Sequence, residues 1–162
     1  MSLSGKGASQ RLTLPGLLLG VGLGGFVDGI VLHQILQWHH LLTSVDGYPA
    51  TTVGGLEANT LADGLFHALT WLATVFGLYL LWRALRAGSA WSGRHLVGLM
   101  LAGWGTFNLV EGTIDHHILG IHHVRAGDGQ AGLDLAFLLL GAALLLGGLA
   151  LARRGEREAV RH

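Results

Sequence analysis

The chain contains four long apolar stretches separated by short segments that are richer in polar residues. They cover approximately residues 14–42, 56–85, 96–119 and 131–152. Each stretch reaches the length of about 20 residues that an α-helix needs to cross the hydrocarbon core of a bilayer. The pattern predicts an all-α integral membrane protein, a four-helix bundle that forms a single transmembrane domain over residues 1–162.

The composition supports this class. Only 12% of the residues are charged and 51% are hydrophobic, whereas a typical soluble domain has about 25% charged residues. Ten acidic side chains balance ten basic ones, while a nucleic-acid-binding protein would show a basic excess. We therefore expect the protein to interact with the lipid bilayer and not with nucleic acid. The sequence is also compatible with a homo-oligomer or with a membrane protein as a partner.

The basic residues predict how the spans are oriented. Nine Lys and Arg residues lie before the first stretch, around the junction of the second and third, or after the fourth, all on one side of the membrane. Arg125 alone lies on the other side. Because Lys and Arg accumulate in cytoplasmic loops, we expect both termini in the cytoplasm and the loops around residues 46–52 and 125–130 outside. The protein would thus be a multi-pass membrane protein with its loop 83–94 also in the cytoplasm.

Two segments repeat the same ionisable residues. Residues 28–40 and 111–123 share the pattern acid-Gly-x-aliphatic-x-His-x-Ile-Leu-x-x-His-His, and residues 63–66 and 134–137 show a fainter echo. We interpret the chain as a duplicated two-helix hairpin. Each copy has an even number of spans, so the copies are parallel and related by a pseudo-twofold axis along the membrane normal. Spans one and three would then face each other.

Acidic residues inside the spans must be neutralised. Each charged side chain in the hydrocarbon costs about 2.5–3.5 kcal/mol by insertion scales, and we expect no buried Lys or Arg to pair with Asp28, Asp63, Glu111 or Asp115. Imidazole and carboxylate suit Zn, Cu, Fe or Mn, and there is no Cys to favour Cu(I). The sequence predicts a divalent transition metal, with hydrogen-bonded His–acid pairs that hold helices together as the alternative.

The candidate ligands fall into three groups. The spans contribute three histidines with three acids that either bind the metal or orient the rings: His33, His67, His116, Asp28, Asp63 and Glu111. The doublets at the outer interface are further ligands, an ion-collecting mouth or solvated ends: His39, His40, His122 and His123. Two residues break the repeat and would mark an asymmetry between the halves: Asp115 and His117. Asp134 is equally a helix cap or a ligand.

The geometry of an ideal helix constrains one of these pairs. Asp28 and His33 are five residues apart, so on an α-helix they point about 140° apart. We therefore expect these two side chains to flank one groove rather than to contact each other.

The segments 28–40, 63–67 and 115–119 resemble those of a bacterial family of four-helix predicted membrane proteins that is catalogued only as a domain of unknown function. The resemblance covers nearly the whole chain. It implies a four-span protein of the bacterial inner membrane and supplies no activity.

Three functions are compatible with these residues. The leading one is a membrane protein with a mononuclear or dinuclear His/carboxylate metal site in the outer leaflet, acting as a metal-dependent oxidoreductase or hydrolase. The second is a non-enzymatic protein that binds or delivers Cu, Zn or Fe. The third is a haem b electron carrier with His33 and His116 as axial ligands, although haem does not require the neighbouring acids.

Overall fold

The computed structural model describes residues 11–89 and 91–159, and all regular structure in this part of the chain is helical. The first helix, α2 (Thr13–Val27), continues into the π-helix η1 (Asp28–Ile35). The second, α3, spans Val53–Arg86. The third, α4 (Gly93–Glu111), continues into the π-helix η2 (Gly112–Ile118), and α5 spans Gln130–Ala159.

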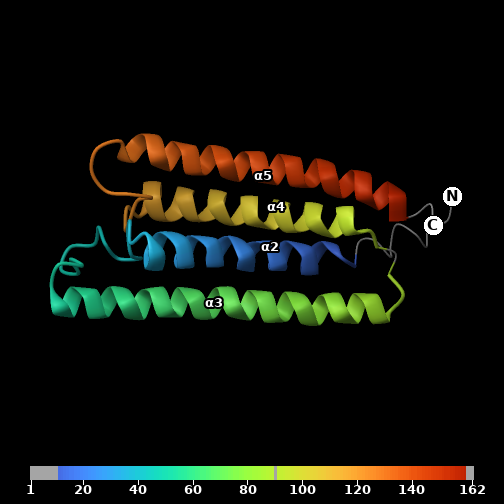
Figure 1. The fold of residues 1–162 in the computed structure, drawn as a ribbon, viewed down its shortest axis with the longest axis horizontal. Helices are drawn as coiled ribbons and strands as arrows, with labels where there is room; N and C mark the ends of the chain where they lie inside the picture. Colours follow the sequence, from blue (N-terminus) through green and yellow to red (C-terminus); the bar gives the residue numbers. More distant parts are fainter. Residues whose placement is uncertain (1–10, 90, 160–162) are drawn as a thin grey trace.

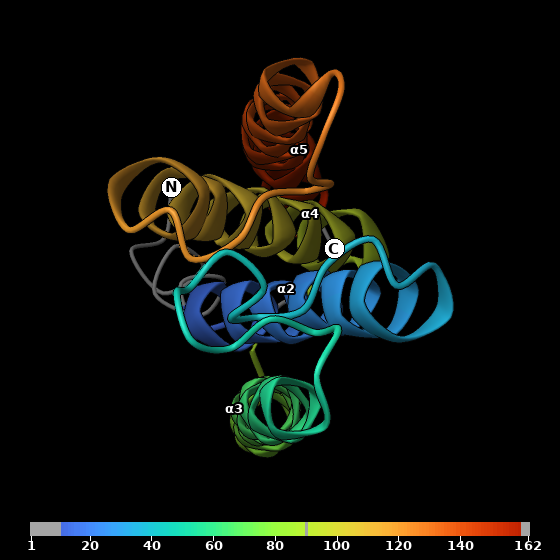
Figure 2. The same cartoon turned by 90° about the vertical axis from the view of Figure 1, so that its left-hand side faces the viewer.

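The four long helices lie side by side in the order α3, α2, α4, α5 (Figures 1 and 2). Successive helices run in opposite directions, so the η1–α3 and η2–α5 loops meet at one end of the molecule (Figure 1). The closest packing is between α4 and α5, α2 and α4, and α2 and α3. The expectation that spans one and three face each other is thus confirmed, within an open, bundle-like row of helices.

Three of the described helical segments are long and apolar enough to cross a membrane: Thr13–Ile35, Val53–Arg86 and Gln130–Glu158. The third predicted span, α4 with η2, is less apolar than these. Its position between α2 and α5 (Figure 2) gives its polar side chains protein neighbours on two sides.

The helices differ clearly from the predicted stretches at two ends: α5 runs to Ala159 rather than to residue 152, and the first helix is shorter than predicted. This helix ends at Ile35 rather than near residue 42. Two residues later, Gln37 adopts a left-handed backbone with φ of 49°, and Gly120 does the same after η2 with φ of 59°. A left-handed residue stops a helix, so the His39–His40 doublet lies in a loop instead of on a span.

Two glycines bring α2 and α4 into close contact. A Cβ atom at Gly20 would lie 2.0 Å from the carbonyl oxygen of Met100, and one at Gly103 would lie 2.2 Å from that of Leu17. Only glycine permits this backbone approach, which is how small residues support helix packing in membranes. The close approach positions the ends of α2 and α4, and the site at those ends, relative to each other.

Candidate metal centre

The loop end of the molecule encloses a cluster of buried ionisable side chains. Four imidazoles and four carboxylates are each at most 7% exposed: His33, His39, His116, His122, Asp28, Asp63, Glu111 and Asp134. Buried ionisable groups require partners, and the contacts within the cluster supply most of them.

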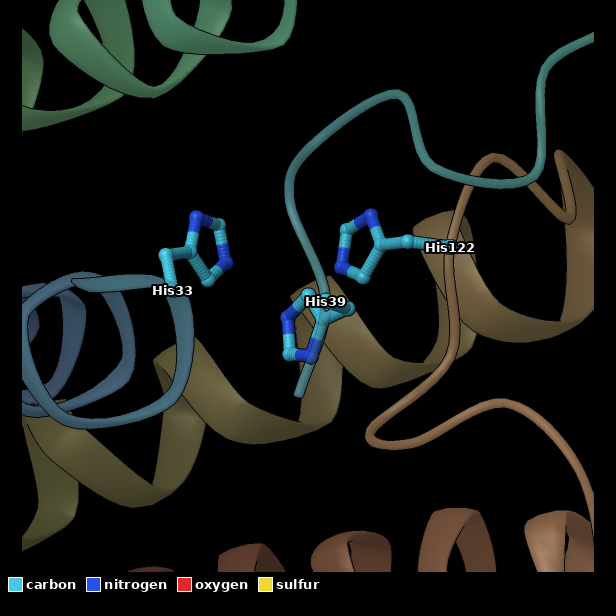
Figure 3. A group of neighbouring side chains, drawn as sticks. All are labelled: His33, His39 and His122. Atoms are coloured by element: carbon cyan, nitrogen blue, oxygen red, sulfur yellow. The ribbon is translucent and has the colours of Figure 1, made fainter. Parts of the chain in front are cut away.

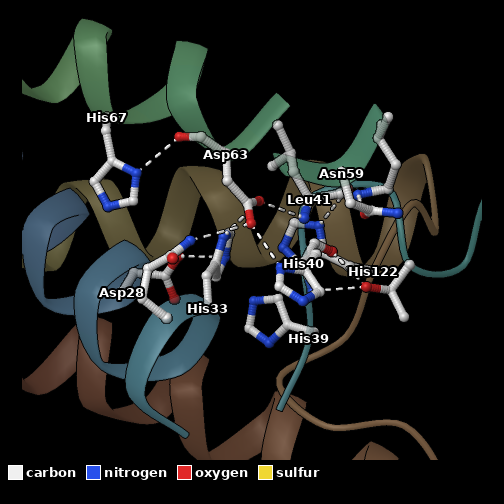
Figure 4. A network of polar contacts seen from close by, with 12 residues as sticks. Asp28, His33, His39, His40, Leu41, Asn59, Asp63, His67 and His122 are labelled. Carbon is white, nitrogen blue, oxygen red and sulfur yellow. Dashed lines mark hydrogen bonds and ion pairs between the residues drawn. The ribbon is translucent and has the colours of Figure 1, made fainter. Parts of the chain in front are cut away.

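In the first half of the chain, Asp63 of α3 organises two histidines and a loop (Figure 4). Its carboxylate accepts from His33 Nδ1 at 2.9 Å, from His40 Nδ1 at 2.7 Å and from the backbone N–H of Leu41 at 2.9 Å. On the other side of its ring, His33 Nε2 lies 3.2 Å from Asp28 Oδ2. The ring of His33 is therefore held between two carboxylates.

The second half reproduces this arrangement around Asp134 of α5. Asp134 Oδ2 accepts from His123 Nδ1 at 2.8 Å and Asp134 Oδ1 from the N–H of Val124 at 3.0 Å. His116 lies between Asp134 Oδ1 at 3.3 Å and Glu111 Oε1 at 3.0 Å. The two sets of contacts join equivalent residues of the repeated segments, which extends the sequence repeat to three dimensions.

The π-helices place each acid beside its histidine. In both, a backbone N–H bonds to the carbonyl five residues earlier, from Leu36 to Val31 and from Leu119 to Ile114. Residues five apart therefore lie over one another, unlike on an α-helix. This corrects the expectation that Asp28 and His33 only flank a groove, because that expectation assumed α-helical geometry.

His39 and His122 form the centre of the cluster. Their rings stack with centroids 4.7 Å apart. His39 Nδ1 donates to the carbonyl of Val124 at 2.9 Å, and His122 Nδ1 donates to that of Leu41 at 3.2 Å. Because a carbonyl only accepts, Nδ1 carries the proton in both rings and Nε2 of a neutral ring offers a lone pair.

The Nε2 atoms of His39 and His122 differ in their contacts. His39 Nε2 is buried without a hydrogen-bond partner among the described residues. Burial, with the neighbouring imidazoles of His122 and His33, lowers the pKa of His39 to about 3, so its ring is neutral near pH 7. His122 Nε2 lies 2.7 Å from Glu111 Oε1. Two acceptors at this distance require a proton or a cation between them.

Two overlapping sets of three side chains have their ligand atoms within 4.8 Å of one another. One is His33, His39 and His122, which come from η1 and from the loops after η1 and η2 (Figure 3). The other is Glu111, His116 and His122. His122 belongs to both sets, so the two sets form one continuous buried centre.

Seven of the sequence-predicted ligands lie outside these sets, and two of them, Asp28 and Asp63, contact His33. His67 donates to the backbone carbonyl of Asp63 at 2.8 Å and its ring is directed away from His39 and His122 (Figure 4). His117 is exposed and donates to the carbonyl of Gly112. Asp115 lines a cavity beside Glu111. His40 and His123, which are partly buried, contact the carboxylates of Asp63 and Asp134.

The structure excludes one of the two roles expected for Asp134. Because α5 begins at Gln130, Asp134 is not the helix cap, and it holds His116 and His123 in the way that Asp63 holds His33 and His40. The echo between residues 63–66 and 134–137 was the signal for this equivalence.

A comparison with family models finds one match, to the family described as predicted membrane protein (DUF2243), over residues 15–155. Neither the curated proteins nor the solved structures contain a match to this chain.

Proposed function

The chain belongs to this family of predicted membrane proteins, and on that premise we propose that it is a multi-pass protein of a bacterial inner membrane with both termini in the cytoplasm. Three helices have the length and hydropathy of spans, and α4 would cross the bilayer between α2 and α5. Of the basic residues that the structure describes, all but Arg125 lie at the end opposite the loops that carry the cluster, which supports the orientation. The buried cluster would then lie toward the outer face.

We propose that this cluster binds a divalent transition metal. The observation that carries the proposal is the orientation of the four buried imidazoles. Asp63, Asp134 and the carbonyls of Val124 and Leu41 face their Nδ1 atoms. Histidines that bind metals are commonly held in this way through the second ring nitrogen. The Nε2 atom of His39 has no partner, and those of the other three rings face the carboxylates of Asp28 and Glu111, which would share the metal with them.

The residues fit such an ion. Four imidazole nitrogens with the carboxylates of Asp28 and Glu111 form a donor set that suits Zn, Cu, Fe or Mn. Two overlapping ligand sets that share His122 accommodate a mononuclear or a dinuclear centre. A bound metal would supply redox chemistry or an activated water. Asp63 and Asp134 would keep the imidazoles oriented. The acids and imidazoles of the cluster are all buried, so the centre would be shielded from bulk water.

We further propose that the two halves arose by duplication of a two-helix hairpin. The support is the recurrence of whole contacts. His33–Asp28 and His33–Asp63 correspond to His116–Glu111 and His116–Asp134. The axis that relates them would pass between the stacked rings of His39 and His122.

A metal-dependent membrane oxidoreductase is the activity we favour, because the centre is buried beside apolar cavities. A non-enzymatic protein that binds or delivers Cu, Zn or Fe is the second candidate, supported by the partly exposed His40 and His123 next to the centre. The ring contacts weigh against haem b, since His39 and His122 each pack against both His33 and His116.

The test is the metal content per chain of protein purified in detergent without chelator or nickel. We expect at least one equivalent of Fe, Mn, Cu or Zn, and its loss in His39→Ala and His122→Ala. The matched control is His95→Ala, because His95 is also buried and its Nδ1 also bonds a backbone carbonyl, that of Ala152. A metal-free wild-type protein, or full occupancy in both loop variants, would overturn the proposal.

A further inference from the structure

A partly open cavity of about 290 Å³ lies beside the cluster, between α2, α3 and α4. Its lining is mainly apolar, with Phe66, Phe107, Val110 and Ile114, and it also includes the two acids Glu111 and Asp115. Val110 and Ile114 are 51% and 41% exposed on the surface of the helix row. The cavity therefore connects the apolar outside of the protein to a carboxylate of the centre.

Glu111 lines this cavity, and one of its two carboxylate oxygens is an unused acceptor. Its side chain is 7% exposed, and its Oε1 atom contacts both His116 and His122. Its Oε2 atom is buried without a hydrogen-bond partner among the described residues. An unsatisfied buried acceptor is costly, so a ligand in this cavity would gain by donating a hydrogen bond to Oε2.

The rings of Phe66 and Phe107 form an aromatic part of the wall, with centroids 6.0 Å apart. Aromatic faces and edges favour an aromatic ligand. The volume lies at the lower end of the range of about 300–1,000 Å³ that is typical of ligand pockets. It therefore suits a single ring, and an attached alkyl tail would remain outside among the lipids.

The equivalent cavity of the other half provides an internal comparison. It also measures about 290 Å³ and is lined by Val27, Asp28 and Leu32. Leu32 occupies the position that corresponds to Asp115, and Gly24 the position that corresponds to Phe107. Of these two cavities, the one beside Glu111 has a second carboxylate and two phenylalanines, whereas the other has one carboxylate and the aromatic rings of Trp104 and Phe137.

We propose that the cavity beside Glu111 binds the head of a lipid-soluble hydroquinone, with its hydroxyl donating to Glu111 and its ring against Phe66 and Phe107. The ligand would enter from the bilayer past Val110 and Ile114. The inference rests on the proposed function in that the chain must lie in a membrane.

The test measures the affinity of the purified protein in lipid nanodiscs for decyl hydroquinone under argon, by isothermal titration calorimetry. The dimethyl ether of the same compound, which has the ring and tail but no donor, is the matched ligand. We expect the hydroquinone to bind at least about tenfold more tightly than the ether, since a tenfold ratio corresponds to roughly one good hydrogen bond. Equal affinities would overturn the proposal.

Two substitutions locate the binding site. Val110→Trp fills the cavity from its exposed rim and should abolish binding, whereas Val27→Trp makes the same change at the equivalent position of the other cavity and should not. Asp115→Leu introduces the residue found at Leu32 and should weaken binding at least severalfold. Unchanged affinity in Val110→Trp, or equal losses in the two Trp variants, would contradict this site.

The metal content of each sample separates this inference from the proposed function. If wild-type protein contains no metal as purified but binds the hydroquinone, the metal centre is overturned and the cavity proposal stands. Absence of binding by fully loaded wild-type protein would overturn the cavity and leave the metal centre.

Discussion

His39 and His122 stack with 4.7 Å between ring centroids and 6° between ring planes, and each ring donates to the backbone of the loop that carries the other. A third link joins the loops, from the N–H of Ser44 to the carbonyl of Ile121 at 2.9 Å. The two loops are therefore held together mainly by the two imidazoles.

These reciprocal hydrogen bonds predict that removing one imidazole loosens the opposite loop. In His39→Ala, the carbonyl of Val124 loses its donor, so we expect faster backbone hydrogen exchange in residues 119–129. In His122→Ala, the same change is expected in residues 36–52, because Leu41 loses its donor. Hydrogen exchange followed by mass spectrometry of the metal-free variants checks both. Faster hydrogen exchange only in the loop that carries the substitution would contradict the prediction that each imidazole holds the opposite loop.

Asp63→Asn and Asp134→Asn should weaken metal binding without preventing folding. Each carboxylate faces Nδ1 of a proposed ligand, His33 or His116, and loss of such a supporting partner typically costs about 10- to 100-fold in metal affinity. Chelator competition measures the effect. Asp46→Asn, in the exposed part of the first loop, is the control and should retain wild-type affinity.

Glu111→Asp should weaken metal binding more than its conservative chemistry suggests. Glu111 contacts both His116 and His122 through one oxygen, at 3.0 and 2.7 Å, whereas the shorter Asp28 contacts His33 alone among the histidines. Shortening Glu111 should remove the contact with His122 and lower the metal affinity by about tenfold or more. An affinity equal to that of the wild type, in the same chelator competition, would show that the longer side chain has no role.

Gly20→Ala and Gly103→Ala should separate α2 from α4. The added methyl would meet the backbone oxygen of Met100 or Leu17, and such overpacking typically costs about 1–3 kcal/mol, which exceeds the helix-propensity gain of about 1 kcal/mol. We expect a lower Tm in detergent together with reduced metal content. Gly64→Ala, where no atom lies within 4 Å of the new Cβ, should not lower the Tm.

The absence of Cys from the sequence permits a direct test of orientation. Asp46→Cys and Asp128→Cys lie in exposed parts of the two loops that meet at one end of the molecule. A membrane-impermeant maleimide should label both in spheroplasts. Gly93→Cys, which is exposed at the opposite end, should react only after permeabilisation. The reverse pattern would place the metal centre on the cytoplasmic side.

Much of the fold could be predicted because apolar length and repeated ionisable residues are local properties of the sequence. The end of the first helix could not, since the apolar pattern continues past Ile35. The chain leaves the helix there through bonds to distant residues. Asp63 accepts from the N–H of Leu41 and Asn59 accepts from that of Leu42. Such contacts between a loop and another helix have no signature in the hydropathy pattern.

The same limit explains which candidate residues the structure brings together in the cluster. Depth within a span favoured His67, but its equivalent position in the second half is Leu138, whereas His39 corresponds to His122. Recurrence was therefore a better guide than depth, because the loops rather than the spans bring the central imidazoles together. His33 and His116, for which both criteria agree, lie in the cluster.

The crossed bonds of His39 and His122 have a consequence for the history of the chain. On the proposed duplication, a lone ancestral hairpin had no second loop to receive its imidazole, so it could form this cluster only by pairing with an identical copy. Fusion made that pairing permanent and released the two copies from identity. On this proposal, the differences between Asp28 and Glu111 and between Leu32 and Asp115 arose after the fusion, and a symmetric pair of subunits became one chain with two unlike sides.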